Sequence, residues 1–269
     1  MKRAKAYAKI NLALVVGPLR ENGKHELVTV LQRIDLADDI DLEPADALTV
    51  EGFDDDTLVR GALEALADAA GVSPRWRARI EKRIPVSAGR GGGSSDAASA
   101  LALANSGLPQ PLAPAEMHTI AAGLGADVPF FLTEGTQLAT GDGTELERVD
   151  LPTDYVVVLV LPDTRSKEST GAVYRGFDGR DGAAGFEERR AVLLDELARV
   201  GHARDLGRLP RNDLDSSHVV EQLEKLGAFR ADVSGAGPTV YGLFEQADEA
   251  EHAAATSRSA GLTWLARPV

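Results

Sequence analysis

The chain has 269 residues, of which 43% are hydrophobic and 26% charged, enough for one large domain or two closely packed lobes. It contains no Cys, which excludes disulfides and thiolate-held metal ions and fits a reducing cytoplasm. The formal net charge of −13 argues against nucleic acid or an anionic membrane as a partner, but allows an anionic small substrate at a locally positive site.

The opening segment alternates apolar and polar residues in the way of β-strands. We expect strands at residues 6–16 and 26–34, joined by a turn at 20–23. A signal peptide is the alternative for the opening segment, but Lys9 and Asn11 interrupt its apolar stretch. No apolar run approaches the roughly 20 residues that span a bilayer, so no membrane partner is expected.

Two acidic runs, at residues 35–43 and 54–56, are predicted to be solvated turns. Between the second run and the middle of the chain, apolar residues recur at helical spacing over 58–70. A short strand is predicted at 77–84.

The rest of the chain mixes helices and strands without strict alternation, which favours an α+β fold over a doubly wound parallel sheet. Loops are predicted in the Pro-punctuated and Gly/Asp-rich stretches, and the elements between them follow from apolar periodicity. In chain order, we expect a linker at 108–114, a helix at 115–124, a strand at 156–161, a surface loop at 177–185, a helix at 186–200, a strand, Gly turn and strand within 230–244, a helix at 248–260 and a strand at 262–266.

The most informative stretch is PVSAGRGGGSS at residues 85–95, which leads into an Ala- and Leu-rich helix ending near residue 105. Four of the five residues at 89–93 are Gly, the exception being Arg90. Glycine lets the backbone approach a ligand closely, and the N–H groups at a helix start favour anions. We therefore interpret the stretch as a phosphate-binding loop.

Other interpretations of the glycine-containing stretches stay open from the residues alone. A flexible Gly/Ser linker with a Ser or Asp N-cap has the same composition. No Lys follows the glycines as in a Walker A loop, and the dinucleotide fingerprint is not matched. Taken alone, DVSGAGPTVYGLF at 232–244 indicates a hairpin, and Asp127 in GLGADVPFFL a cap or turn before an apolar strand.

Taken together and in order, these pieces resemble the GHMP kinase superfamily. The resemblance covers essentially the whole chain and rests on AYAKINLAL, KHELVTVLQRIDLADDI, PVSAGRGGGSSDAASAL, GLGADVPFFL, GTQLATGDGTEL, RNDL and VSGAGPTVYGLF. It implies a two-lobed α+β fold. The N-terminal lobe, residues 1–149, would be ribosomal S5 domain 2-like, and the C-terminal lobe, residues 150–269, ferredoxin-like.

The resemblance also implies a reaction, in which ATP phosphorylates an alcohol. AKINLAL and HELVT are similar to the members that act on a cytidine-diphosphate-linked polyol. Asp127 would accept the proton of the hydroxyl, and Lys9 would keep Asp127 ionised and offset charge on the phosphoryl group. Asn11, His25 and Tyr174 would line the substrate pocket.

The implied ATP site is made mainly of backbone. Mg²⁺ is expected to arrive bound to ATP, no residue is assigned as its ligand, and the Ser hydroxyls at the helix start could bind either phosphate oxygens or Mg²⁺. The residues that would wrap the phosphates are Pro85, Val86, Ser87, Ala88, Gly89, Arg90, Gly91, Gly92, Gly93, Ser94 and Ser95.

Elementary chemistry agrees with these roles. Phosphoryl transfer needs in-line positioning, charge neutralisation and a carboxylate that orients the nucleophile. A Lys within ~4–6 Å lowers the pKa of an Asp, and a buried ammonium needs such a partner. Without the resemblance, Lys9 would be interpreted as a solvent-facing strand residue and Tyr174 as a core-packing helix residue.

The sequence departs from the family pattern at several positions. Lys24 stands where the family carries an aromatic residue that stacks on the base, and could pair with a diphosphate instead. Arg90 replaces an apolar residue, and either contacts a phosphate or points to solvent. The alternatives are a GHMP kinase for a mevalonate- or homoserine-type alcohol, or a non-catalytic nucleotide-binding module. The oligomeric state, monomer or homodimer, is left open.

Overall fold

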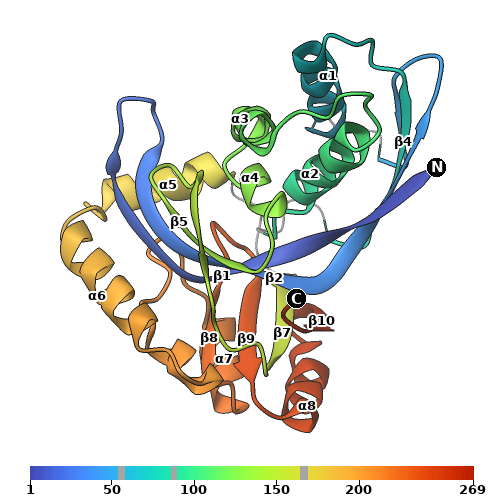
Figure 1. Cartoon of the computed structure of the whole chain (residues 1–269). Coiled ribbons are helices and arrows are strands. Elements are labelled where there is room, and N and C mark those ends of the chain that lie inside the picture. The colour runs from blue at the N-terminus through green and yellow to red at the C-terminus, as the bar shows by residue number, and fades with distance from the viewer. Residues whose placement is uncertain (54–57, 86–89, 164–168) are drawn as a thin grey trace. The chain divides into compact units, whose positions relative to one another are not determined.

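The computed structural model describes residues 1–53, 58–85, 90–163 and 169–269, and the chain forms two compact units (Figure 1). Unit 1 comprises Met1–Ala8, Leu36–Val86 and Gly91–Glu134. Unit 2 comprises Lys9–Asp35, Ser87–Arg90 and Gly135–Val269. The sequence-based lobe boundary at residues 149 and 150 stays a prediction.

Two long paired strands open the chain. β1 (Lys2–Leu19) and β2 (His25–Pro44) follow the predicted strands but extend beyond both of them (Figure 1). The predicted turn joins them: the Arg20 N–H donates to the Lys24 carbonyl at 2.8 Å, and Gly23 has a φ of 77°, which favours glycine. These parts of the sequence-based prediction are confirmed.

The acidic run at 35–43 was predicted to be a solvated turn, and this is wrong: it continues strand β2. Side chains alternate between the two faces of a strand. Asp38 and Ile40, both 0% exposed, point into the core, whereas Asp39 and Asp41 lie on the other face. The carboxylates of Asp38, Asp39 and Asp41 each have a cationic partner, which is why the run can stay extended instead of turning in solvent. The second acidic run, 54–56, lies outside the described residues.

Unit 1 packs helices on one face of a sheet. Within it, β4 pairs antiparallel with the second half of β2, and β3 pairs parallel with β4. Its elements are β3 (Thr49–Glu51), α1 (Leu58–Ala70), β4 (Trp76–Glu81), α2 (Gly92–Asn105), α3 (Pro114–Leu124) and α4 (Val128–Phe131). The predicted helices at 58–70 and 115–124 are confirmed. The strand at 77–84 ends earlier, at Glu81, and residues 128–131 form a helical turn where an apolar strand was predicted.

Small side chains make the core of unit 1. Helix α2 buries Ala97, Ala98, Ala100, Leu101 and Ala104, and it packs on α1, which buries Leu63 and Leu66. Because Ala adds little bulk, the two helices can approach closely, and Ala favours the helix itself. The Ala-rich composition thus lets α2 pack closely on α1 in the core of unit 1.

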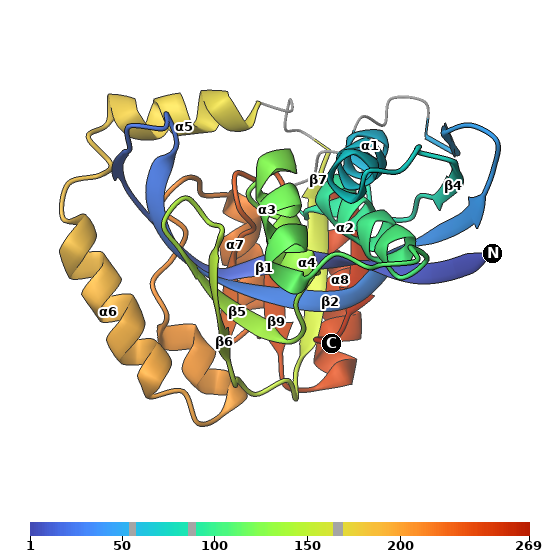
Figure 2. The ribbon, with the colours of Figure 1, turned by 45° about the horizontal axis from the view of Figure 1, so that its top comes forward.

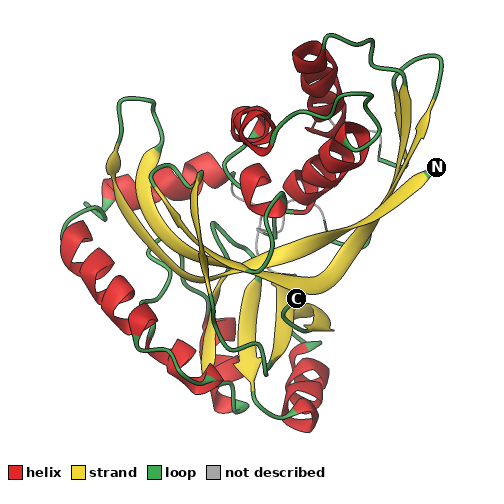
Figure 3. Cartoon of the chain, viewed as in Figure 1, coloured by secondary structure: helices red, strands yellow, loops and turns green. Residues whose placement is uncertain are grey.

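Unit 2 contains a hairpin and a second sheet. The hairpin, β5 (Thr136–Thr140) and β6 (Glu145–Val149), pairs with the first half of β2. The second sheet is antiparallel throughout, in the order β10-β7-β9-β8. Its strands are β7 (Val156–Pro162), β8 (Arg230–Val233), β9 (Val240–Phe244) and β10 (Gly261–Ala266), and the helices packed on it are α7 (His218–Lys225) and α8 (Ala247–Ser257). The predicted strands here are confirmed, and Figure 3 shows the mixture of helices and strands that makes the fold α+β.

The predicted surface loop at 177–185 is partly wrong. Its first residues end helix α5 (Thr170–Gly179), which leads into α6 (Phe186–Ala198) (Figure 2). Phe177 is 1% exposed and packs with Leu14 of β1 and Leu214. The Gly- and Asp-rich composition of 177–185 predicted a loop, but the buried Phe177 packs the end of α5 onto the core of unit 2.

Candidate active site

The glycine-rich stretch ends in the start of helix α2. Gly91 holds the N-cap position with a φ of 67°, a left-handed conformation suited to glycine. The Ser95 N–H donates to the Gly91 carbonyl at 2.8 Å, so the N–H groups of Gly92, Gly93 and Ser94 precede the first helical hydrogen bond. With the dipole of a 14-residue helix behind them, these groups suit an anion such as phosphate. Val86, Ser87, Ala88 and Gly89 lie outside the described residues, and Pro85 precedes them.

A buried ion-pair cluster lies against this helix start. The Lys82 ammonium donates to Asp38 Oδ2 at 2.5 Å and to Asp96 Oδ2 at 2.7 Å. Asp38 also accepts the backbone N–H groups of Arg83 and Ile84, the latter at 2.7 Å. We call Asp38, Lys82 and Asp96 the α2 cluster.

Gly92 is the point where helix and cluster meet. A Cβ at Gly92 would lie 3.1 Å from Ile84 Cγ2 and 3.4 Å from Lys82 Nζ. The first residue of α2 therefore touches both the ammonium and the segment that follows β4, and the lack of a side chain permits this approach.

Burial dominates the electrostatics of the α2 cluster. Desolvation raises the pKa of Asp96 to about 7, and the carboxylate of Asp38 adds to the rise while Lys82 opposes it. Burial acts against the charge of Lys82, but Asp96 and Asp38 together raise the pKa of its ammonium group. Lys82 thus stays charged at neutral pH, and Asp96 exchanges a proton near neutrality.

In unit 2, the AKINLAL segment of β1 forms a second polar network. Lys9 is 4% exposed, and its Nζ donates to Asn11 Oδ1 at 2.7 Å. The interpretation of Lys9 as a solvent-facing strand residue is therefore wrong. Asn11 donates to Thr29 Oγ1 at 2.8 Å, and Thr29 donates to the Ala13 carbonyl at 2.6 Å. The chain of hydrogen bonds fixes the rotamers of Lys9 and Asn11. The Lys9 backbone N–H also donates to the Arg90 carbonyl at 3.1 Å, which ties β1 to the middle of the glycine-rich stretch.

His25 and Tyr174, both predicted to bind substrate, lie together. Their rings stack with centroids 4.9 Å apart and an interplanar angle of 29°. His25 Nε2 lies 2.8 Å from Asp178 Oδ1 on α5, and the edge of Phe177 contacts the imidazole at 5.9 Å. Tyr174 also packs against the apolar cluster around Phe177, so the core-packing interpretation of Tyr174 holds alongside its contact with His25.

The two departures from the family pattern have partners within unit 2. Lys24 Nζ donates to Asp142 Oδ2 at 2.8 Å, and this hydrogen bond lowers the pKa of Asp142. Arg90 does not point to solvent: it is 1% exposed, and its guanidinium lies over the Trp264 ring, 4.5 Å from the ring centroid. Both cations are thus held by neighbours in the folded chain.

Asp127 takes the N-cap position of α4 in unit 1. It is half-buried, and its carboxylate makes no capping hydrogen bond to that helix. Asp127 nevertheless lies in the turn that the Val128 N–H closes on the Gly125 carbonyl at 3.1 Å. The interpretation of Asp127 as a cap or turn residue is therefore confirmed for the turn, and no side-chain cap is formed. Asp127 belongs to unit 1 and Lys9 to unit 2, so the predicted pairing of the two stays a prediction.

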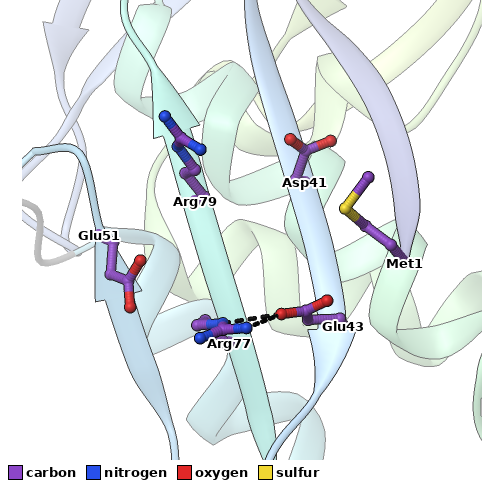
Figure 4. Close-up of a pocket in the computed structure, with 6 residues that line it drawn as sticks. All are labelled: Met1, Asp41, Glu43, Glu51, Arg77 and Arg79. Atoms are coloured by element: carbon purple, nitrogen blue, oxygen red, sulfur yellow. Dashed lines mark hydrogen bonds and ion pairs between the residues drawn. The ribbon is translucent and has the colours of Figure 1, made fainter.

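A pocket of about 280 Å³ lies on the outer face of the unit 1 sheet and contains none of the predicted site residues (Figure 4). Its charges are paired across the strands. Arg77 donates to Glu43 from Nε at 2.8 Å, and Arg79 lies opposite Asp41 in the register of β4 and β2. Internal pairing leaves this pocket little net charge with which to attract a ligand.

Several polar residues of these networks were missed from the sequence. They share one property, a partner that lies far away in the chain: Asp38, Lys82, Asp96, Thr29 and Asp178. Only Lys82 and Asp96 carried a local signal, since they flank the glycine-rich stretch on either side.

A glycine-rich helix start, a buried lysine network and a mixed α+β architecture are features that a nucleotide-dependent phosphotransferase would need. The comparisons with known proteins agree. The family model for the GHMP kinases N terminal domain matches residues 57–135, and that for GHMP kinases C terminal matches 183–260.

Individual relatives narrow the class further. The chain is 37% identical to a 4-diphosphocytidyl-2-C-methyl-D-erythritol kinase of Chlorobium phaeobacteroides (strain BS1), over 93% of this chain and 91% of the relative. A crystal structure of a 4-(cytidine 5'-diphospho)-2C-methyl-D-erythritol kinase superposes with a TM-score of 0.79 at 31% identity, covering 99% of both chains. A crystal structure of mevalonate kinase has a TM-score of 0.75 at 13% identity, covering 100% and 99%, and shows the shared fold alone.

The chain belongs to the GHMP kinase family and, within it, to the family of 4-diphosphocytidyl-2-C-methyl-D-erythritol kinases. It is thus an ATP-dependent small-molecule kinase with the α+β GHMP kinase fold. Within the described part of the chain, no helix is both long and apolar enough to cross a bilayer.

Proposed function

We propose that this enzyme transfers the γ-phosphoryl group of ATP to the 2-hydroxyl of 4-diphosphocytidyl-2-C-methyl-D-erythritol. The step belongs to non-mevalonate isoprenoid precursor biosynthesis, and we place it in the cytoplasm. The observation that carries the proposal is the 37% identity to a relative of that name over 93% of this chain.

The phosphates of ATP are bound by the backbone of the glycine-rich stretch. Gly92, Gly93 and Ser94 supply N–H donors at the start of α2, ahead of the first helical hydrogen bond, and such donors suit an anionic tail. Mg²⁺ enters with ATP and supplies further neutralisation of the phosphate charge when bound. No protein residue is assigned as its ligand.

Asp127 orients the substrate hydroxyl and accepts its proton, and Lys9 offsets charge on the transferring group. Lys9 can do this because its hydrogen bond to Asn11 and burial at 4% exposure hold the ammonium in one place. Preorganised charge of this kind stabilises a transition state without reorganisation during the reaction.

The cytosine is read by His25, with Tyr174 providing an aromatic surface. If the Asp178 carboxylate accepts the Nε2–H of a neutral His25, Nδ1 remains as an acceptor. An acceptor suits the exocyclic amino group of cytosine and disfavours the carbonyl of uracil at the same position. Lys24, which is paired with Asp142, is not required for this recognition.

A substrate panel tests the proposal. The enzyme with Mg²⁺-ATP is assayed on the cytidine-linked substrate, mevalonate and homoserine, and products are followed by ³¹P NMR. We expect a new phosphate monoester only with the cytidine-linked substrate. Phosphorylation confined to mevalonate or homoserine contradicts the proposal and favours another GHMP activity.

Variants test the assigned roles. Asp127→Asn and Lys9→Met are each expected to lower kcat by about 10²–10⁴-fold, the range for a positioned proton acceptor and for a charge-stabilising group. Asp150→Asn is the control, because its side chain is 93% exposed. Equal background turnover by wild type and Asp127→Asn on every alcohol instead supports a non-catalytic nucleotide-binding module.

A further inference from the structure

The α2 cluster joins three separate segments of unit 1. Asp38 lies on β2, Lys82 follows β4, and Asp96 lies in the second turn of α2. The Lys82 ammonium bridges the two carboxylates, and Asp38 in addition holds two consecutive backbone N–H groups of the segment that enters the glycine-rich stretch. One cluster therefore fastens the polypeptide on both sides of residues 85–95.

Stability alone does not account for such a cluster. The side chains of Asp38 and Asp96 are 0% and 1% exposed, and that of Lys82 is 16% exposed. Taking charges out of water carries a desolvation penalty, and apolar residues of similar volume often serve equally well or better in such places. Buried ionic groups are best attested where one particular arrangement must be specified.

The arrangement specified here is the position of the helix start. Lys82 lies directly beneath the first residue of α2, with its Nζ 3.4 Å from the position of a Cβ on Gly92. A lone cation there would oppose the positive end of the helix dipole. Asp38 and Asp96 offset that charge, and the Phe53 ring covers the ammonium at 5.9 Å from its centroid.

We propose that Asp38, Lys82 and Asp96 are positioning residues for ATP. They lock the first turn of α2 against the segment that follows β4, so that its N–H groups point at the phosphates before ATP arrives. Lys82 acts through Asp38 and Asp96 without itself contacting the nucleotide. This inference rests on the proposed binding of the ATP phosphates at the start of α2.

The test measures binding of Mg²⁺-adenylyl imidodiphosphate, a non-hydrolysable ATP analogue, by titration calorimetry without any alcohol present. For folded Lys82→Met we expect Kd to rise about tenfold, which corresponds to about 1.4 kcal/mol. The KM for the alcohol is expected to change less than about twofold, because the cluster lies under the phosphate loop. Calorimetry also reports the fraction of competent sites, so a purely structural defect appears as fewer sites with unchanged Kd.

A double variant distinguishes positioning from direct contact. In Lys82→Met the buried carboxylate of Asp38 loses its cation, and Lys82→Met/Asp38→Asn removes that stranded charge. If Lys82 acts through the cluster, the double variant regains part of the affinity, with Kd at least about threefold below that of Lys82→Met. If Lys82 contacts a phosphate, the double variant binds no better than Lys82→Met, and the proposal is overturned.

A neighbouring ion pair provides the matched control. Lys5 pairs at 2.6 Å with Asp39, the residue after Asp38 but on the opposite face of β2. Lys5→Met is expected to leave Kd for the analogue unchanged. Unchanged Kd in folded Lys82→Met would also overturn the proposal.

If Lys82→Met does not fold, Asp96→Asn is the replacement variant, because Asn keeps the volume and an acceptor for Lys82. The Kd of Asp96→Asn for the analogue is expected to rise about threefold, and an unchanged Kd counts against the inference. Should the wild-type enzyme itself not bind the analogue, the proposed ATP site fails instead. Should it bind the analogue but phosphorylate only another alcohol, the substrate assignment fails and the positioning role stands.

Discussion

The two faces of strand β2 differ in how their aspartate carboxylates are paired with cations. On the core face, Asp38 shares one lysine with Asp96, and both carboxylates are out of contact with solvent. On the outer face, Asp39 and Asp41 pair with the half-exposed or exposed cations Lys5 and Arg3. Asp38 and Asp39, which lie in these two settings, are neighbours in the sequence.

The pKa values show what the difference means. Burial raises the pKa of Asp96 to about 7, whereas the hydrogen bond from Lys5 lowers the pKa of Asp39, and that from Arg3 lowers the pKa of Asp41. Where solvent has access, pairing favours the charged carboxylate, and inside the core desolvation outweighs the same pairing. Outer-face pairs are therefore expected to be replaceable, and the α2 cluster is not.

Removing the shared cation is expected to have the largest effect. Lys82→Met leaves the buried carboxylate of Asp38 without a counter-charge, and breaking a buried pair in this way costs about 3–5 kcal/mol of the free energy of unfolding. Urea unfolding followed by circular dichroism measures the loss. A loss no greater than that of Lys5→Met would remove the distinction between the two faces.

The pH dependence of stability comes next. The pKa of Asp96 is higher in the folded chain, about 7, than its ordinary 3.8, so its stabilising contribution is full below pH 4 and is lost as pH rises through 7. The raised pKa of Lys82 matters only above about pH 10, outside this window. We expect the Tm of wild type to fall relative to that of Asp96→Asn between pH 5 and pH 7.5. The corresponding loss in the free energy of unfolding is a few kcal/mol at most. Parallel Tm curves for the two proteins would contradict this.

Asp38 connects the α2 cluster to the backbone, and replacing it is expected to lower the free energy of unfolding by an intermediate amount. Asp38→Asn keeps one carbonyl acceptor but removes the charge that Lys82 and the two N–H groups share, a change of about 1–3 kcal/mol. Hydrogen exchange measures it locally: the amides of Arg83 and Ile84 should lose protection, while those of β10 in unit 2 should not. Uniform loss across both units would point to global destabilisation only.

The smallest effect is expected on the outer face. Lys5→Met removes an ion pair whose lysine side chain is 46% exposed, and such pairs contribute about 0–1 kcal/mol. Asp39 also retains Arg83 as a partner at 2.8 Å. Thermal unfolding at low and high salt is the measurement, and the small difference between variant and wild type should shrink as salt is added. A loss as large as that of Lys82→Met would contradict the prediction.

Local signals predicted most of the regular structure. Apolar periodicity predicted the helix at 58–70 and the strands of the second sheet, because the pattern of each element lies within its own residues. The β1–β2 turn followed as the break between two strand patterns. Short, mostly polar elements such as β3 and β6 were not predicted, since their pairing depends on neighbours distant in sequence. The prediction of a solvated turn at 35–43 was wrong for the same reason, because the cations that pair with this acidic half of β2 come from β1, β4 and the segment after β4.

The sequence by itself determined the glycine-rich helix start, the strand bearing Lys9 and Asn11, and, through motif resemblance, the family, because these depend on residues that are close together in the chain. Only the tertiary structure decided which charges are buried together. Asp38 meets Lys82 and Asp96 from 44 and 58 positions away, and His25 meets Asp178 from 153. Desolvation depends on everything packed around a group, so the same residue type becomes a charge paired with exposed cations on one face of β2 and part of a buried, position-fixing cluster on the other.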